Sequence, residues 1–430
     1  MKDALVATAY SLPGVQHSVD GLVDALANDL NVVLVLPDGA ESDQIERILR
    51  RKLWDRDFGH RVVDVPQLDE HQPPELALSI HLGALESGQA KLAPRIEDLV
   101  CGKSLPRVII LQGLGKLPAH RIPAWRALLL AWASVPIVDA AWGASLLCAF
   151  GTNSLLVGVQ QDPARRLSVR YMWGDLSALE LRMACRLCNS QGSKAGRWRE
   201  GLLPSLAGGD PYLCEHIWDH VLGDEPGLIT ALAGYGLNVR GWTSADLLAL
   251  GADRLAHNTD GPAAEPPHEP PVRHRRLWAA GAVYHTPEFG MELHTAALAV
   301  MGHDAQVRHR LWRAQLPLLL PAIDGVRLSI CRALTSAHGD TWPYRWLEPR
   351  FESDQQAVRQ TPLACDLGHV RHLLEARQSQ LHRERFWLPL VRMALQLRNM
   401  LAHYAPLTFS DFAALEDEMA RSGIHDTTGW

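Results

Sequence analysis

The chain is short of cysteine, of positive charge and of long apolar runs. Its seven cysteines, an odd number scattered over 430 residues, argue against a disulfide framework and favour a reducing cytosol. The net charge of −6 gives no general attraction to nucleic acid, so any RNA contact has to be local. We find no signal peptide, and the apolar stretch 127–137 is too short to span a membrane. We therefore expect a cytoplasmic protein.

Residues 1–165 alternate short apolar segments with amphipathic ones. An apolar content of 47% is enough for two or three domains with well-formed cores. The expected strands are 5–8, 32–36, 60–65, 108–111, 137–138 and 155–159. The expected helices between them are 19–30, 42–53, 74–85 and 123–134. This pattern predicts an α/β domain with a parallel sheet that is covered on both faces.

The residues of a phosphate-binding loop are missing from the places where such a sheet would carry one. The first expected strand leads into 10–18, which contains no Gly-Lys-Ser/Thr. Gly102, Lys103 and Ser104 precede a strand instead of following one. The run 113–116 does follow a strand, but Leu117 replaces the hydroxyl, and Gln112 stands where an acid would hold the metal ion. We therefore expect no ATP hydrolysis and assign no cofactor.

The middle of the chain, 166–295, carries weaker signals. The run 206–213 contains Gly-Gly-Asp-Pro-Tyr-Leu and resembles a turn in the helical lid of AAA-type and STAND-type ATPases. A helix opened by Thr243 and a strand over 277–284 are typical of a winged-helix-like module. The resemblance implies that 1–165 is a degenerate P-loop ATPase-like domain, a pseudo-ATPase, followed by a lid and a winged-helix-like module.

Two groups of side chains could suggest zinc. Cys185 and Cys188 form one C-x-x-C pair without a second pair, and zinc needs four ligands. Cys214, His216 and His220 lack the H-E-x-x-H spacing. We expect the cysteine pair to be structural and buried, expect packing or surface roles for Cys214, His216 and His220, and predict no metal site.

Residues 296–430 are expected to form an all-α bundle. Its helices are a long first helix over 311–331, kinked at Pro317 and Pro321, a second over 367–380, a third over 381–404 and a last over 411–421. The stretch 336–362 is interpreted as a connecting insertion. Thr408 and Asp411 have the spacing of a capping box at the start of the last helix.

The third helix has two different faces. At about 100° per residue, one stripe is apolar and is the face that a bundle would bury. Its members are Leu390, Val391, Ala394, Leu397 and Leu401. The opposite face carries Arg392, Gln396, Asn399 and His403, with Arg398 at its flank. We interpret the polar face as a surface that meets a ligand, with Arg392, Gln396 and Arg327 of the first helix as further RNA contacts.

The arrangement Arg398-Asn399-x-x-x-His403, with the helices around it, resembles the signature of the HEPN-domain family. In that family two bundles pair so that both motifs line one cleft, where many members cut RNA without a metal ion. The resemblance implies that His403 is the general acid or base, that Arg398 stabilises the phosphorane and that Asn399 orients the phosphate or the imidazole. Some members use a tyrosine two residues after the histidine with a nucleotidyltransferase partner. Position 405 is alanine here, so that arrangement is not expected.

The leading hypothesis is a HEPN-type, metal-independent endoribonuclease that acts as an effector or toxin in bacterial stress or anti-phage defence. The resemblance implies a homodimer formed through the HEPN bundle. The pseudo-ATPase part would sense or dock a protein partner, such as a sensor, an ATPase or an antitoxin. The alternative is a non-catalytic adaptor that dimerises and recruits a partner protein.

Overall fold

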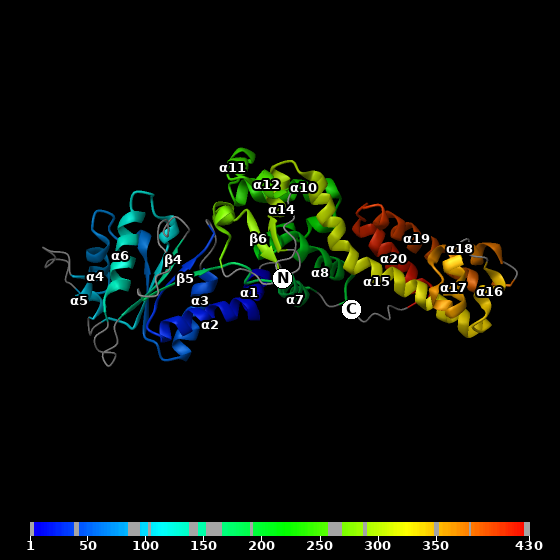
Figure 1. Cartoon of the computed structure of the whole chain (residues 1–430), viewed down its shortest axis with the longest axis horizontal. Coiled ribbons are helices and arrows are strands. Elements are labelled where there is room, and N and C mark those ends of the chain that lie inside the picture. Colours follow the sequence, from blue (N-terminus) through cyan, green and yellow to red (C-terminus); the bar gives the residue numbers. More distant parts are fainter. Residues whose placement is uncertain are drawn as a thin grey trace.

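The computed structural model describes residues 4–37, 43–84, 95–101, 105–136, 145–151, 166–189, 192–256, 269–286, 290–347, 352–377 and 380–424. The chain passes from a sheet with helices at one end, through a helical middle part, to a helical bundle at the other end (Figure 1). The expected α/β region followed by a helical region is therefore present.

The sheet has five parallel strands in the order β2-β3-β4-β1-β5. Their bounds are β1 Asn31–Val35, β2 His60–Asp64, β3 Val108–Gln112, β4 Leu146–Gly151 and β5 Leu167–Tyr171. The inner strands β1 and β4 are buried along their whole length, whereas the edge strands β2 and β5 carry partly exposed residues. The helices α4 Pro74–His81 and α6 Ile122–Ser134 lie toward one side of the sheet, and α2 Pro13–Ala27 and α3 Asp43–Asp55 toward the other (Figure 1). The short helix α5 Ile96–Val100 packs against α6.

Three expectations for this region need correction or lie outside the description. The segment 5–8 is not a strand: it is part of helix α1 Leu5–Tyr10, which packs against helices of the middle part. Strands β4 and β5 were not predicted, and β5 carries the sheet beyond residue 165 to Tyr171. The strands expected at 137–138 and 155–159 lie outside the described residues.

Because the first strand differs from the predicted one, the segment where a phosphate-binding loop would lie also differs. Because 5–8 is helical, the first strand is β1, and the sequence from Asn31 to Arg51 also contains no lysine. Gly113 has a φ of 76° and opens a short 3₁₀ turn, Leu114–Lys116. A Cβ at Gly113 would lie 2.5 Å from Cδ of Pro66, so this glycine serves close packing of two turns. Residues 102–104 lie outside the described residues.

The middle part is built from short helices around a two-stranded hairpin. The helices are α7 Ala178–Cys188, α8 Lys194–Ala207, α9 Pro211–Ile217, α10 Glu225–Gly234, α11 Ser244–Ala249, α12 Ala252–Ala256, α13 Arg275–Ala279 and α14 Thr295–Val300. The hairpin pairs β6 Val283–Thr286 with β7 Gly290–Leu293. The strand expected at 277–284 is wrong over most of its length, because α13 and a turn at Gly281 occupy it and the strand begins only at Val283. Thr243 caps α11 as expected, since its hydroxyl accepts a hydrogen bond from the Asp246 amide at 3.1 Å.

The C-terminal bundle is centred on one long helix, α15 Asp304–His338. Its other helices are α16 Trp342–Trp346, α17 Glu352–Gln360, α18 Leu367–Ala376, α19 Leu388–Ala402 and α20 Phe409–Arg421. α15 runs without interruption through Pro317 and Pro321, and the insertion 336–362 forms α16 and α17. Each proline removes one helical hydrogen bond, and the packing of α15 along much of its length offsets that loss. The capping box at Thr408 and Asp411 is confirmed.

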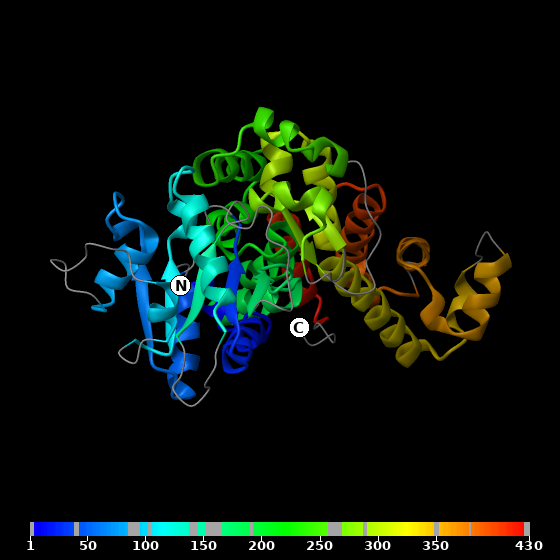
Figure 2. The same cartoon turned by 60° about the vertical axis from the view of Figure 1, so that its left-hand side comes forward.

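α15 joins the middle part to the bundle (Figures 1 and 2). Gly201 of α8 allows close approach to α15, since a Cβ there would lie 3.0 Å from Cδ2 of Leu318. Arg197 of α8 makes a two-pronged ion pair with Glu416 of α20 at 2.6–2.9 Å. Among the described residues, α15 is the one helix long and apolar enough to cross a membrane by length and composition. Its contacts with α8, α14, α18 and α19 are those of a core helix.

Candidate functional site

The end of α19 is closed by a left-handed turn made without glycine. Tyr404 has a φ of 59°, and its amide donates to the carbonyl of Leu401 at 3.2 Å. The amide of Ala405 reaches back to the carbonyl of Met400 at 3.0 Å, a hydrogen bond typical of a helix C-terminus. His403 is the C-cap residue and therefore stands at the last turn, where the helix dipole favours positive charge.

The two expected faces of α19 are present. The apolar stripe is buried, with Leu390, Val391 and Ala394 at 0% exposure. Its contacts are with α15, α18 and α20. The polar residues Arg392, Gln396, Arg398, Asn399 and His403 are exposed. Burying one side of the helix therefore leaves the other side open to solvent.

Three of the exposed side chains have no partner in the described residues. Within the described part of the chain, Arg398, Asn399 and His403 make no side-chain hydrogen bond or ion pair. Arg392 differs, because its guanidinium donates to Glu375 of α18 at 2.9 Å. Such an exposed pair is weak and can exchange its carboxylate for another anion. The fold thus holds the motif residues on one surface without using them for its own stability.

Arg327 is used differently from our expectation. Its guanidinium donates to the carbonyls of Leu363 and Cys365 and to Asp324. The side chain is only 19% exposed, and it ties α15 to the turn before α18. We therefore do not retain Arg327 as an RNA contact.

Next to the motif lies an aromatic cluster of His309, Trp312 and Tyr404 that we did not predict. The rings of Trp312 and Tyr404 are 4.7 Å apart, and those of His309 and Trp312 are 5.2 Å apart. Trp312 also donates from Nε1 to the carbonyl of Leu401 at 2.7 Å, which fixes it beside the end of α19. Tyr404 is 64% exposed, and an exposed ring can stack against a nucleobase. The sequence shows Tyr404 directly after the motif, but its neighbours on α15 lie about 90 residues earlier. The sequence alone therefore does not show that these rings meet.

The residues weighed as metal ligands are divided between the core, which holds the cysteines, and the surface, where His220 is exposed. Cys185, Cys188 and Cys214 are buried thiols, and Cys188 contacts the Thr8 hydroxyl at 3.7 Å. The rings of His216 and His220 stack at 6.4 Å. In the described ranges, no group of three or more His, Cys, Asp or Glu side chains is arranged to hold a metal ion.

A second polar cluster, Asp210, Tyr235, Arg240 and His294, is buried in the middle part. Asp210 caps α9 in the Gly-Gly-Asp-Pro-Tyr-Leu turn. Its Oδ2 accepts hydrogen bonds from the Tyr235 hydroxyl at 2.6 Å and from Arg240 at 2.7 Å. His294 Nδ1 accepts from the Ala296 amide, so Nε2 carries the proton and donates to Asp210 at 3.3 Å. The cluster ties α9, the turn after α10 and the hairpin to one carboxylate.

Burial and charge act in opposite directions on this cluster. Burial alone would raise the pKa of Asp210, but Arg240, His294 and Tyr235 hold that pKa well below its usual range. Burial lowers the pKa of His294 despite the nearby carboxylate, and Arg240 adds to that lowering. His294 is therefore neutral in the folded protein at neutral pH, as its two hydrogen bonds require.

This predicts a pH-dependent stability. An unfolded histidine has a pKa of about 6.5. Because the folded pKa of His294 is lower, acidification from about pH 7.5 to about 5.5 adds a proton to the unfolded chain first. The free energy of unfolding is expected to fall by up to about 1.4 kcal/mol per pH unit below the unfolded pKa from this residue. Thermal unfolding of the parent and of His294→Gln at both pH values measures the difference.

The matched control is His382→Gln, because His382 is exposed. It should keep the parent's pH dependence, whereas His294→Gln should flatten it. An equal slope in His294→Gln and parent would contradict the assignment of a neutral, buried His294.

Comparison with family models, with curated proteins and with solved structures found no match to this chain.

Proposed function

We propose that the protein is a HEPN-type endoribonuclease that cuts RNA without a metal ion. The observation that carries this proposal is the set Arg398, Asn399 and His403 at the end of α19, which is exposed and has no partner among the residues that the structure describes. These side chains combine an imidazole, the side-chain type used for proton transfer near neutral pH, with a permanently charged planar donor. Packing of the buried stripe explains why α19 forms a helix of the bundle. It does not explain why these polar residues occupy the exposed side.

The chemistry needs only groups that the RNA and the protein supply. The ribose 2′-hydroxyl attacks the adjacent phosphorus, its proton passes to a base, and the bond to the 5′-oxygen of the next nucleotide breaks. An imidazole such as that of His403 serves as the base or as the acid that protonates the leaving oxygen. The guanidinium of Arg398 stabilises the charge on the phosphorane, and Asn399 orients the phosphate or the imidazole. The products carry a 2′,3′-cyclic phosphate and a 5′-hydroxyl.

A second copy of the chain completes the cleft in this proposal. The motif of one copy contains one imidazole, that of His403, while the cleavage reaction uses both a base and an acid. Pairing two bundles through their motif faces supplies both roles from the two His403 side chains. The N-terminal α/β part, which lacks a phosphate-loop lysine, then senses or docks a protein partner in a reducing cytosol, in bacterial stress or anti-phage defence.

The test is RNA cleavage by the purified full-length chain in the presence of a chelator. We expect fragments of a labelled single-stranded RNA that end in a 2′,3′-cyclic phosphate, since the proposed reaction uses no divalent cation. Mass spectrometry of the fragment ends distinguishes this chemistry from metal-dependent hydrolysis, which leaves a different end. If no RNA is cut in any tested condition while the protein dimerises, the adaptor function is favoured instead.

A further inference from the structure

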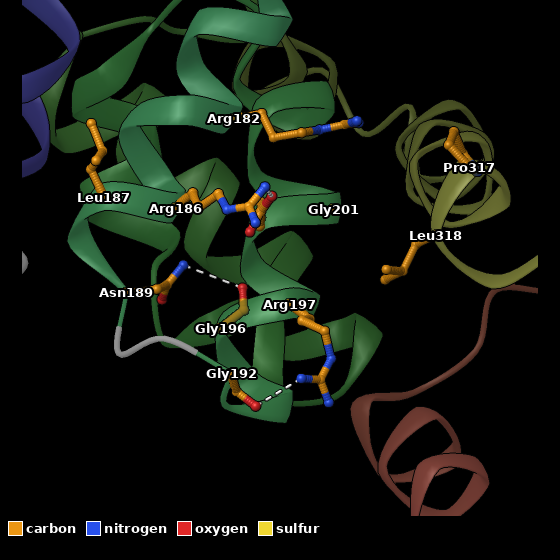
Figure 3. Close-up of a pocket in the computed structure, with 11 residues that line it drawn as sticks. Arg182, Arg186, Leu187, Asn189, Gly192, Gly196, Arg197, Gly201, Pro317 and Leu318 are labelled. Carbon is orange, nitrogen blue, oxygen red and sulfur yellow. Dashed lines mark hydrogen bonds and ion pairs between the residues drawn. The ribbon is translucent and has the colours of Figure 1, made fainter. Parts of the chain in front are cut away.

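A cavity of about 520 Å³ lies between the middle part and the bundle (Figure 3). Its walls come from α7, from α8 and from Pro317 and Leu318 of α15. The volume is in the range of pockets that hold small organic ligands. None of the motif residues of α19 lines it, so it is separate from the proposed ribonuclease site.

Arginine dominates the polar lining of this cavity. Arg182 and Arg186 are one turn apart on α7, so their like charges are neighbours on one helix face. Arg197 enters from α8, but its charge is already matched by Glu416. Arg186 has only a long contact of 4.0 Å with Glu200 and is 66% exposed. The cavity therefore holds more positive charge than its lining carboxylate neutralises.

Arg182 is the side chain that most needs an acceptor. Its Nε is buried and has no hydrogen-bond partner, and within the described residues it forms no ion pair. It extends from α7 toward α15 across the cavity (Figure 3). The side chain as a whole is only partly buried, but a buried N–H donor without an acceptor is costly and is rare in folded proteins.

We infer that this cavity binds the phosphate group of a small phosphorylated ligand, of the size of a nucleoside monophosphate. Arg182 and Arg186 bind the phosphate, and the apolar surfaces of Leu187, Pro317 and Leu318 contact the rest of the ligand. A tetrahedral phosphate accepts from donors that approach from several directions, which fits guanidinium groups a helical turn apart better than one planar carboxylate does. The same phosphate could be carried by a free nucleotide or by the 5′ end of an RNA.

The position of the cavity implies that a bound ligand affects how the middle part and the bundle are arranged. The arginines belong to the middle part, whereas Pro317 and Leu318 belong to the helix that carries the bundle. A ligand seated there contacts both, so it stabilises one arrangement of the two parts relative to the other.

The test measures binding of five probes to the full-length protein by calorimetry and by thermal shift. The probes are inorganic phosphate, AMP, adenosine and a short RNA with and without a 5′-phosphate. We expect binding of AMP with a Kd below about 1 mM and no binding of adenosine. Arg182→Met is expected to weaken AMP binding at least about tenfold, because a charged hydrogen bond is lost. Without ligand this variant should be as stable as the parent, since no internal partner of Arg182 is removed.

A second variant guards against a folding defect. Leu187 is 69% exposed, so Leu187→Glu should fold normally and should repel the phosphate at the rim. Arg50→Met, which alters an exposed arginine of α3 paired with Glu46, is the matched control and should bind like the parent. Binding of the 5′-phosphorylated RNA alone would identify an RNA end as the source of the phosphate and would support the site. No binding of any phosphate-bearing probe, or equal binding by parent, Arg182→Met and Leu187→Glu, would overturn it.

Discussion

Replacing His403 with alanine is expected to reduce RNA cleavage by about 10²- to 10⁴-fold, the range for loss of a general acid or base. The unfolding temperature should stay within error of the parent's, because the imidazole is exposed and has no internal partner among the described residues. The backbone amide of residue 403 keeps its hydrogen bonds to Asn399 and Met400 in the variant. Single-turnover cleavage of labelled RNA with chelator present measures the effect.

The control for this experiment is His382→Ala. His382 is also an exposed histidine of the bundle, but it precedes α19 and lies outside the motif. It should cleave at the parent rate. Arg398→Lys keeps the charge but loses the planar donor, so its rate should fall between those of the parent and His403→Ala. Parent-like cleavage by His403→Ala would remove the proposed role of this residue, whatever the other variants do.

Replacing Arg240 with methionine is expected to destabilise the middle part by about 3–5 kcal/mol, the cost of leaving a buried carboxylate without its charge partner. Arg240 is 15% exposed and Asp210 is 9% exposed, so little water can replace the guanidinium. Tyr235 and His294 remain as hydrogen-bond donors, but neither carries a charge at neutral pH. Thermal or urea unfolding followed by tryptophan fluorescence reports the change, because Trp242 packs edge-on against His294, with ring centroids 5.2 Å apart.

A double-mutant comparison separates this charge effect from lost packing. Asp210→Asn keeps an oxygen for the cap of α9 but removes the charge. The double variant Arg240→Met, Asp210→Asn should therefore be more stable than the sum of the single losses predicts. Arg308→Met, which removes an exposed ion pair with Glu225, is the matched control and should leave the transition unchanged. Strict additivity of the two single variants would show that the ion pair is not what Arg240 contributes.

The helices of the bundle were the most predictable elements. The amphipathic stripe of α19 repeats at 3.6 residues over four turns, and the capping box at Thr408 and Asp411 is a local signal. Such signals are contained within one segment, so they appear in the sequence. The surface position of Arg398, Asn399 and His403 follows from the same periodicity.

The strands were less predictable. The run 5–8 is short and apolar, and nothing in its periodicity separates a strand from a buried helix end. It is helical because it packs against α7 and α9, which lie more than 160 residues later. β5 was missed because it is an edge strand. It is buried only at Leu167 and Ser168, and its later residues are partly or fully exposed, so the segment has no continuous apolar run.

The sequence by itself determined strands β1, β2 and β3 with the helices between them, the faces of α19 and the lack of a phosphate-loop lysine, because each depends on residues close together in the chain. Tertiary structure alone decided that Arg327 binds backbone carbonyls, that Asp210 meets Arg240 and His294, and that Trp312 supports Tyr404. It also decided that Arg182 faces a cavity closed by α15. These contacts join residues 30 to 136 positions apart, and the packing of the elements, which no local pattern encodes, sets which of them meet.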